Sequence, residues 1–232
     1  MILTVETFEK YVGQSVKDPY GRYVGVIAGF YSEIDGTVSY VNIEFADGTF
    51  AKLPVNRFEF KPEEVVLVPE WKAEALSVKK KLEVARKRIK ALDDLYAKGE
   101  IAKHAYDAFK KKLEADLGKL KIESREVRKI LQNRLRQLEK QVEELEKAYA
   151  SLKMVFFAGE ISEPTFKRAT DIIKRSIEKC DAEKKDIKSS ISELEKIEST
   201  PISLPTIAKP AKEEEIPKAE EPLVVHVVEG EH

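Results

Sequence analysis

The feature that most constrains the fold is an apolar repeat of about three and a half residues in the middle of the chain. The repeat begins near Lys72, and no proline lies between Pro69 and Pro164. This period places one apolar stripe along a helix, and the stripe must be buried against another helix. The first series consists of Ala75, Val78, Leu82, Ala85, Ile89, Leu92 and Tyr96. The repeat therefore predicts a rod of long, paired helices over residues 71–198.

One short sequence recurs where the repeat is interrupted. YAKGEI at residues 96–101 is followed by FFAGEI at residues 156–161. A glycine at the end of a helical pattern is typical of a left-handed C-terminal cap, so each copy predicts a helical hairpin, with breaks near 99 and 159. The central helix, from about Lys103 to Phe157, would measure about 80 Å at 1.5 Å per residue. The first and third helices are expected to fold back on its opposite halves.

Residues 1–70 have a different pattern, in which apolar residues alternate between closely spaced turn signals. DPYG at residues 18–21 and the pairs Asp35-Gly36 and Asp47-Gly48 predict tight turns between short strands. A small sheet of five or six strands protects its edges most easily by curling into a barrel. The segment GQSVKDPYGRYVGVIAGF resembles the PRC-barrel domain, a fold that by itself assigns no activity.

The net charge of −1 conceals an uneven distribution. Residues 1–70 carry 6 basic and 11 acidic side chains, residues 71–198 carry 32 and 24, and residues 199–232 carry 3 and 7. The basic residues of the rod form candidate contacts for the phosphates of DNA or of anionic lipid. These candidates are Lys79, Lys80, Lys81, Arg86, Lys87, Arg88, Lys90, Lys110, Lys111, Lys112, Arg125, Arg128, Lys129, Arg134 and Arg136. The alternative is that they solvate an exposed helix and pair with glutamates one turn away.

The sequence offers little for catalysis. It contains no glycine-rich phosphate loop, no paired cysteines or histidines at metal-ligand spacing, and no nucleophile elbow. Cys180, the single cysteine, falls on the apolar stripe, where we expect a buried thiol rather than a nucleophile. We therefore expect no enzymatic activity, no cofactor, no metal and no small-molecule substrate. The start of the chain lacks the pattern of a signal peptide, so a cytoplasmic protein is expected.

The last segment separates into a linker and a strand. Residues 199–221 are rich in proline and glutamate and are expected to be flexible. Within residues 222–232, LVVHVV is apolar on both faces of a strand, which suits a place between a sheet edge and a covering groove. We expect this strand to bind another protein. The alternatives are that it pairs with the barrel of its own chain or remains disordered.

The order of the three parts resembles the CdvA family of archaeal cell-division proteins. The resemblance rests on GQSVKDPYGRYVGV and EIDGTV in the barrel and on EPLVVHVVEGE at the end. It implies that the terminal peptide binds the ESCRT-III homologue CdvB by adding a strand to its winged-helix domain. The strand would consist of Leu223, Val224, Val225, His226, Val227 and Val228. It also implies polymerisation and association with membrane and with DNA.

The predicted fold class is thus α+β in separate segments: a small PRC-like β-barrel, long antiparallel coiled-coil helices, and a disordered tail ending in a short strand. The predicted function is a non-enzymatic scaffold that polymerises at the division site, on the inner face of the cell membrane or near the nucleoid, and recruits CdvB. The alternative is a nucleic-acid-binding or ribosome-assembly protein with a PRC barrel.

Overall fold

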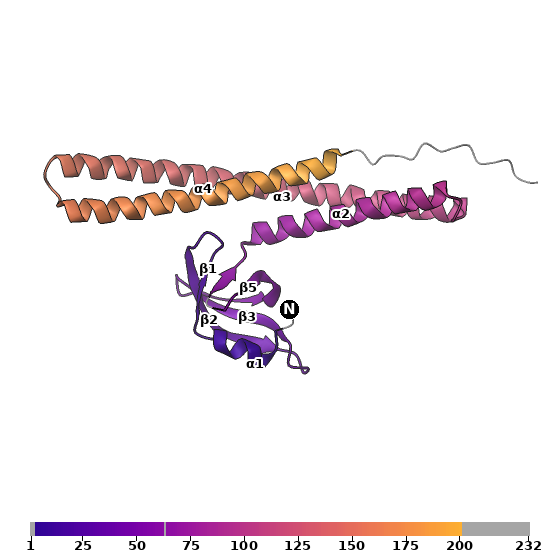
Figure 1. Cartoon of the computed structure of the whole chain (residues 1–232), viewed down its shortest axis with the longest axis horizontal. Coiled ribbons are helices and arrows are strands. Elements are labelled where there is room, and N and C mark those ends of the chain that lie inside the picture. The colour runs from indigo at the N-terminus through magenta and orange to yellow at the C-terminus, as the bar shows by residue number, and fades with distance from the viewer. Residues whose placement is uncertain (1–2, 63, 201–232) are drawn as a thin grey trace, which may run out of the picture.

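A computed structural model describes residues 3–62 and 64–200 of the chain (Figure 1). It contains a small curled sheet near the N-terminus and a rod of three long helices. The fold class predicted from the sequence is confirmed for these two parts. The predicted linker and terminal strand lie outside the described residues, apart from the first two positions of the linker.

The N-terminal domain is a six-stranded sheet with short helices at its ends. The strands lie in the order β4-β3-β2-β1-β6-β5, antiparallel except for β1 with β6. The elements are α1 (Val5–Phe8), η1 (Glu9–Tyr11), β1 (Ser15–Lys17), β2 (Tyr23–Ser32), β3 (Val38–Phe45), β4 (Phe50–Pro54), η2 (Val55–Arg57), β5 (Phe58–Phe60) and β6 (Val65–Leu67). The sheet curls into a half-barrel whose two ends, β4 and β5, are joined by η2.

Apolar side chains on the inner face of the curled sheet form the first hydrophobic core. Its central ring is Phe8, which is fully buried and packs against Phe30 and Phe60 at centroid distances of 5.0 and 5.3 Å. Gly25 lets β2 approach β3 closely, because a Cβ atom there would lie 2.0 Å from the carbonyl oxygen of Glu44. A close backbone approach is thus the reason for glycine in this strand.

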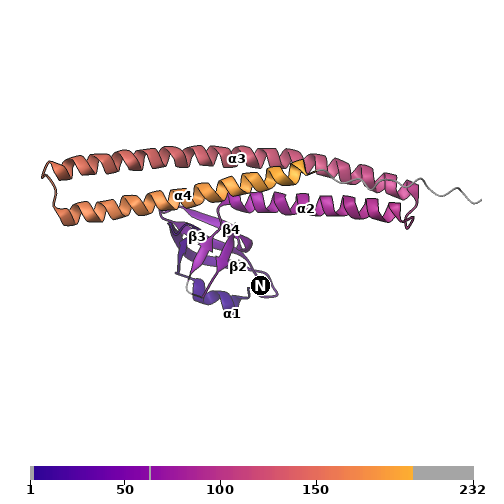
Figure 2. The same ribbon diagram turned by 45° about the horizontal axis from the view of Figure 1, so that its top comes forward.

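The rod consists of α2 (Glu70–Ala97), α3 (Lys103–Phe157) and α4 (Glu163–Ser199). The long helix α3 runs the length of the rod, and α2 and α4 both lie antiparallel to it (Figure 2). Gly99 and Gly159 lie in the two turns with φ of +74° and +78°, as expected for glycine caps.

The two outer helices overlap beside the middle of α3 instead of covering separate halves. With 28 and 37 residues, they are together longer than the 55-residue α3, so their ends must run past each other. Lys72 of α2 reaches Asp186 of α4, and Lys79 reaches Glu193, which shows that α2 and α4 run parallel there. The rod is therefore three helices thick in the middle and two helices thick at each end.

The apolar stripes read from the sequence form the second hydrophobic core. The buried stripe residues are Ala75, Val78, Leu82, Ala85, Ile89, Leu117, Val127, Leu131, Leu138, Cys180, Ile187 and Leu194. Leu131, Leu138 and Ile187 are almost completely buried, as expected for seam positions that contact neighbouring helices. Cys180 is also buried, which confirms its prediction as a core thiol.

Candidate functional site

The curled sheet docks on the rod through a polar contact at the loop between β1 and β2. Asp18 organises this loop, because its carboxylate accepts hydrogen bonds from the backbone N–H of Tyr20 at 2.9 Å and of Arg22 at 2.8 Å. Gly21 completes the turn with φ of +76°. The predicted DPYG turn is thus present, and it presents Tyr20 and Arg22 to helix α4.

A buried carboxylate, Glu183, lies at the centre of this contact. Arg134 of α3 donates to it from Nε at 2.7 Å and from Nη2 at 3.1 Å, and Arg22 donates from Nη1. Burial opposes ionisation of Glu183, but the hydrogen bonds from Arg134 and Arg22 outweigh it and hold the pKa of the carboxyl below its ordinary value. One side chain therefore joins α3, α4 and the sheet domain.

A second set of contacts flanks the first. Tyr20 donates its hydroxyl to Asp186 at 2.8 Å, and Lys72 donates to the same carboxylate oxygen at 2.6 Å. Burial, and then the hydrogen bond to Asp186, raise the pKa of Tyr20, so its proton stays in place. Lys179 also donates to the carbonyl of Gly21 at 2.8 Å. These bonds orient the sheet domain on the face formed by α2 and α4 (Figures 1 and 2).

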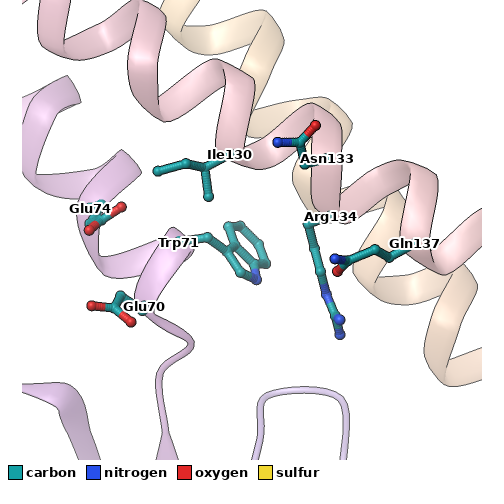
Figure 3. A pocket seen from close by; sticks show the side chains of 7 residues that line it. All are labelled: Glu70, Trp71, Glu74, Ile130, Asn133, Arg134 and Gln137. Atoms are coloured by element: carbon teal, nitrogen blue, oxygen red, sulfur yellow. The ribbon is translucent and has the colours of Figure 1, made fainter.

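Two shallow hollows lie along the groove between α2 and α3. The first, of about 380 Å³, surrounds Trp71, whose indole ring lies between Ile130 and Arg134 (Figure 3). The second, of about 360 Å³, lies toward the α2–α3 turn and includes Val84, Leu113 and Leu120. The ion pair between Lys81 and Glu123 also bridges α2 and α3. These hollows bring together apolar and charged side chains but no nucleophile with an adjacent base.

The described residues form no metal-binding cluster. Within residues 3–62 and 64–200, no group of three or more His, Cys, Asp or Glu side chains is placed to hold a metal ion. In the same ranges, no helix has the length and the apolar composition needed to cross a membrane. His104, the one histidine in these ranges, is exposed in the first turn of α3.

Each end of the rod is closed by a matched pair of aromatic rings. Tyr96 stacks on Tyr106 at the α2–α3 turn, and Phe156 stacks on Phe166 at the α3–α4 turn, each pair with a centroid distance of 4.3 Å. The repeated sequence motif thus builds the same turn twice. At the first turn, the buried Asp93 also accepts a hydrogen bond from Lys110 at 2.6 Å.

The structure divides the basic residues predicted to bind an anion into two groups. The first group has partners within the chain and consists of Lys79, Lys81, Arg86, Lys110, Arg128, Lys129, Arg134 and Arg136. Arg86 and Arg128, for example, bind the last turn of α4, where Arg86 donates to the carbonyl of Ile197 and Arg128 donates to Glu198 at 2.9 Å. These bonds fix where α4 ends beside α2 and α3.

The second group is exposed, and no side-chain hydrogen bond or ion pair involves it among the described residues. It consists of Lys80, Lys87, Arg88, Lys90, Lys111, Lys112 and Arg125. All seven lie on α2 or α3, and the five nearest the turn between these helices are Lys87, Arg88, Lys90, Lys111 and Lys112. Most of the exposed candidates therefore lie toward the end of the rod formed by the α2–α3 turn.

Sequence reasoning missed the role of Glu183. The apolar spacing along α4 does not distinguish Glu183 from its neighbour Lys184, but the structure buries Glu183 and leaves Lys184 partly exposed. Either residue continues the spacing of three or four from Cys180 to Ile187. A buried glutamate is expected where cations can pair with it, and the complementary Arg134 and Arg22 come from distant parts of the chain.

The described part of the chain is a β domain docked on an antiparallel coiled-coil rod, an architecture that offers long surfaces for assembly rather than an enclosed cavity. The family model of the CdvA-like coiled-coil domain matches residues 70–217. The chain is also similar to Cell division protein A of Sulfolobus acidocaldarius, with 35% identity over 204 residues that cover 88% of this chain and 85% of that protein. The chain therefore belongs to the CdvA family, and this membership supports a role in cell division.

Proposed function

We propose that the chain is a non-enzymatic scaffold of the division site, which polymerises, contacts an anionic surface and recruits the ESCRT-III homologue CdvB through Leu223–Val228. The observation that carries this proposal is that the described residues form two hydrophobic cores, one in the sheet domain and one in the rod. We propose that the apolar terminal strand serves a partner instead of these cores. Family membership favours this role over ribosome assembly.

Recruitment would occur by β-augmentation, in which the strand pairs with a sheet edge of the partner's winged-helix domain. Alternate valines would fill pockets on both sides of that sheet. Many strands presented by one polymer would raise their local concentration and make a weak contact avid.

The test of recruitment is calorimetric titration of the full chain with the winged-helix domain of the ESCRT-III homologue. Val225→Asp should weaken binding by at least about tenfold, since it places a charge on an apolar face of the strand. Ala211→Asp, which adds the same charge to the linker, is the matched control. Equal binding by all three proteins would contradict recruitment by the strand, and loss of helicity in Val225→Asp would contradict a tail independent of the cores.

Polymerisation would use the exposed apolar side chains of the rod. Ile130 and Val84 are exposed and line the two hollows of the α2–α3 groove, where a second rod would bury them. Ile130→Glu should reduce the fraction of protein that sediments as polymer, whereas Gln132→Glu, which adds the same charge on another face of α3, should not. Unchanged sedimentation of Ile130→Glu would exclude this groove as the assembly surface.

The anionic surface would be bound by the exposed basic residues of the α2–α3 hairpin. Both lipid head groups and DNA present phosphates, so vesicles with anionic lipid and duplex DNA should be compared directly. The double variant Lys111→Gln/Lys112→Gln should weaken binding and flatten its salt dependence. The control is Lys129→Gln/Arg136→Gln, which removes the same charge from side chains bonded within α3. Equal loss in both variants would indicate a diffuse charge effect instead of a hairpin site.

A further inference from the structure

The curled sheet ends in an edge strand, β4, that is paired on one side. It forms a ladder with β3 from Phe50 opposite Glu44 to Pro54 opposite Tyr40. Within residues 3–62 and 64–200, no other backbone hydrogen bond involves β4. An edge strand directs alternate N–H and C=O groups away from its neighbour, and these groups are a template for another strand.

Both faces of the sheet beside this edge carry apolar side chains. On the outer face, Phe50 is 67% exposed, and Pro54 lies opposite Tyr40 of β3. On the inner face, Ala51 and Leu53 are partly buried against the core of the sheet. A strand added to this edge would therefore contact apolar side chains on both of its faces.

The one charged side chain of β4 is directed away from the edge. The amine of Lys52 lies over the rings of Tyr31 and Tyr40, at 4.0 and 4.3 Å from their centroids. These rings belong to β2 and β3, so the lysine folds back over the sheet. Lysine on an edge strand commonly discourages pairing, but here its charge is held by cation–π contacts.

The other edge strand of the sheet, β5, is a poorer template for an added strand. Strand β5 has three residues, from Phe58 to Phe60. The segment after it turns back at once, where Lys61 donates its N–H to Glu64 at 2.9 Å. Three residues give few ladder bonds, so β4 is the edge that best accommodates a six-residue strand.

The chain itself contains a strand of matching chemistry at residues 223–228. LVVHVV is apolar on both faces, as the β4 edge requires. Helix α4 ends at Ser199, and the sheet domain contacts it between Cys180 and Asp186, which is about 20–30 Å back along the helix. Residues 201–222 span about 25 Å on average and about 75 Å when extended. The strand can therefore reach the sheet of its own chain.

We infer that the free edge of β4 is a docking site for the terminal strand of the same chain, residues 223–228. The linker places the strand at an effective concentration on the order of millimolar, so even a weak pairing with a dissociation constant of about 0.1 mM is about 90% formed. The pairing does not depend on the proposed function. The effect of this pairing on recruitment rests on the proposed function, because a partner that binds the strand must first displace it from β4.

Hydrogen exchange of the full chain tests the pairing. Among residues 50–53, the amides that are not bonded to β3 should exchange about tenfold more slowly in the natural sequence and in Ala211→Asp than in Val225→Asp. Equal exchange in the three proteins overturns the inference. The same samples should show unchanged exchange in β6, which is paired on both sides, with β1 and with β5.

A disulfide cross-link separates pairing within one chain from pairing between two. In a Cys180→Ser background, Phe50→Cys is combined in turn with Val224→Cys, His226→Cys or Val228→Cys, and the pair that lies directly opposite should oxidise to a cross-linked monomer, since such strand neighbours satisfy disulfide geometry. Glu6→Cys with His226→Cys, on an exposed part of α1, is the control and should not cross-link. A cross-linked dimer would assign the edge to a second copy, and no cross-link would remove the site altogether.

Titration with the winged-helix domain separates this inference from the proposed function. Phe50→Asp, which changes an exposed side chain, should free the strand and tighten binding of that domain by up to about tenfold. Slow exchange in β4 without partner binding would refute recruitment and keep the inference. Partner binding of equal strength in both proteins, with fast exchange in β4, would refute the inference and keep recruitment.

Discussion

Replacement of Glu183 by glutamine tests whether one buried carboxylate holds the sheet domain and the helices of the rod together. Glutamine preserves the shape of the side chain and removes its charge. Arg22 and Arg134 then face each other without the anion that both of them bind. We expect the variant to fold and to be less stable at neutral pH.

The expected loss in the free energy of unfolding follows from how deeply Glu183, Arg22 and Arg134 are buried. Removal of one partner from a fully buried ion pair costs about 3–5 kcal/mol. The side chain of Glu183 is 2% exposed, but those of Arg22 and Arg134 are 26% and 36% exposed, so water partly solvates the guanidinium groups that remain. We therefore expect a loss of about 2–3 kcal/mol, which corresponds to about 4–12 °C in melting temperature for a chain of this size.

The assay is thermal unfolding, followed by circular dichroism and by the fluorescence of Trp71, the single tryptophan, which lies beside Arg134. The pKa of Glu183 is lowered in the folded protein, so its contribution is present above the unfolded pKa of about 4.3 and disappears as the pH falls through the folded pKa. The difference between Glu183→Gln and the natural sequence should be constant from pH 7 to about pH 5 and should shrink below about pH 4.

The matched control is Glu126→Gln, which removes the same charge from an exposed pair with Lys129 on α3. Exposed pairs contribute little, so its melting temperature should stay within about 1 °C of the natural value. If Glu183→Gln and this control had the same melting temperature at pH 7, the reasoning about the buried carboxylate would be wrong. It would also be wrong if the stability difference between Glu183→Gln and the natural sequence grew as the pH falls.

Four further substitutions test the packing and the backbone conformation. Leu131→Ala, in the fully buried middle of α3, should lower the free energy of unfolding by about 2–5 kcal/mol in urea titrations. Gly118→Ala should raise the melting temperature because an added Cβ meets nothing within 4 Å on α3, whereas Gly99→Ala should lower it because alanine disfavours a φ of +74°. Gly25→Ala should disrupt the sheet, seen as fast hydrogen exchange in β2 and β3, because its Cβ would lie 2.0 Å from a carbonyl oxygen of β3. A thermal stability of Gly99→Ala equal to that of Gly118→Ala would contradict the assigned cap.

The elements that could be read from the sequence are those specified by local, repeated patterns. The spacing of Val78, Leu82 and Ile89 gave the buried side of α2, and the positions of Gly99 and Gly159 gave the turns. These patterns succeed because each helix must bury one stripe whatever its partner is. The tight turns of the sheet could be read for the same reason, since φ above zero favours glycine.

The packing of the three helices and of the sheet domain against one another could not be predicted from such local patterns. The overlap of α2 with α4 depends on the relative lengths and stagger of three helices, which one stripe does not determine. Arg134 is predicted as a basic surface residue because Arg136 and other basic residues of α3 lie nearby in the sequence, but Glu183, which binds it, lies 49 residues away. The sequence predicts a turn at the docking loop but not its contact with α4, because Arg22 and Glu183 lie 161 residues apart.

The polar contact between the sheet domain and the rod also explains how the chain holds the sheet in one orientation on the helices. Hydrophobic docking would orient the sheet weakly, whereas the hydrogen-bonded carboxylates Glu183 and Asp186 fix the positions of Arg22, Tyr20 and thus the whole β1–β2 loop. The sheet is held beside the middle of the rod, within reach of a tail that starts where α4 ends. A polymer of such rods would therefore repeat each sheet edge and each terminal strand at a regular spacing. At every subunit, the terminal strand could then pair either with the β4 edge of its own chain or with a partner.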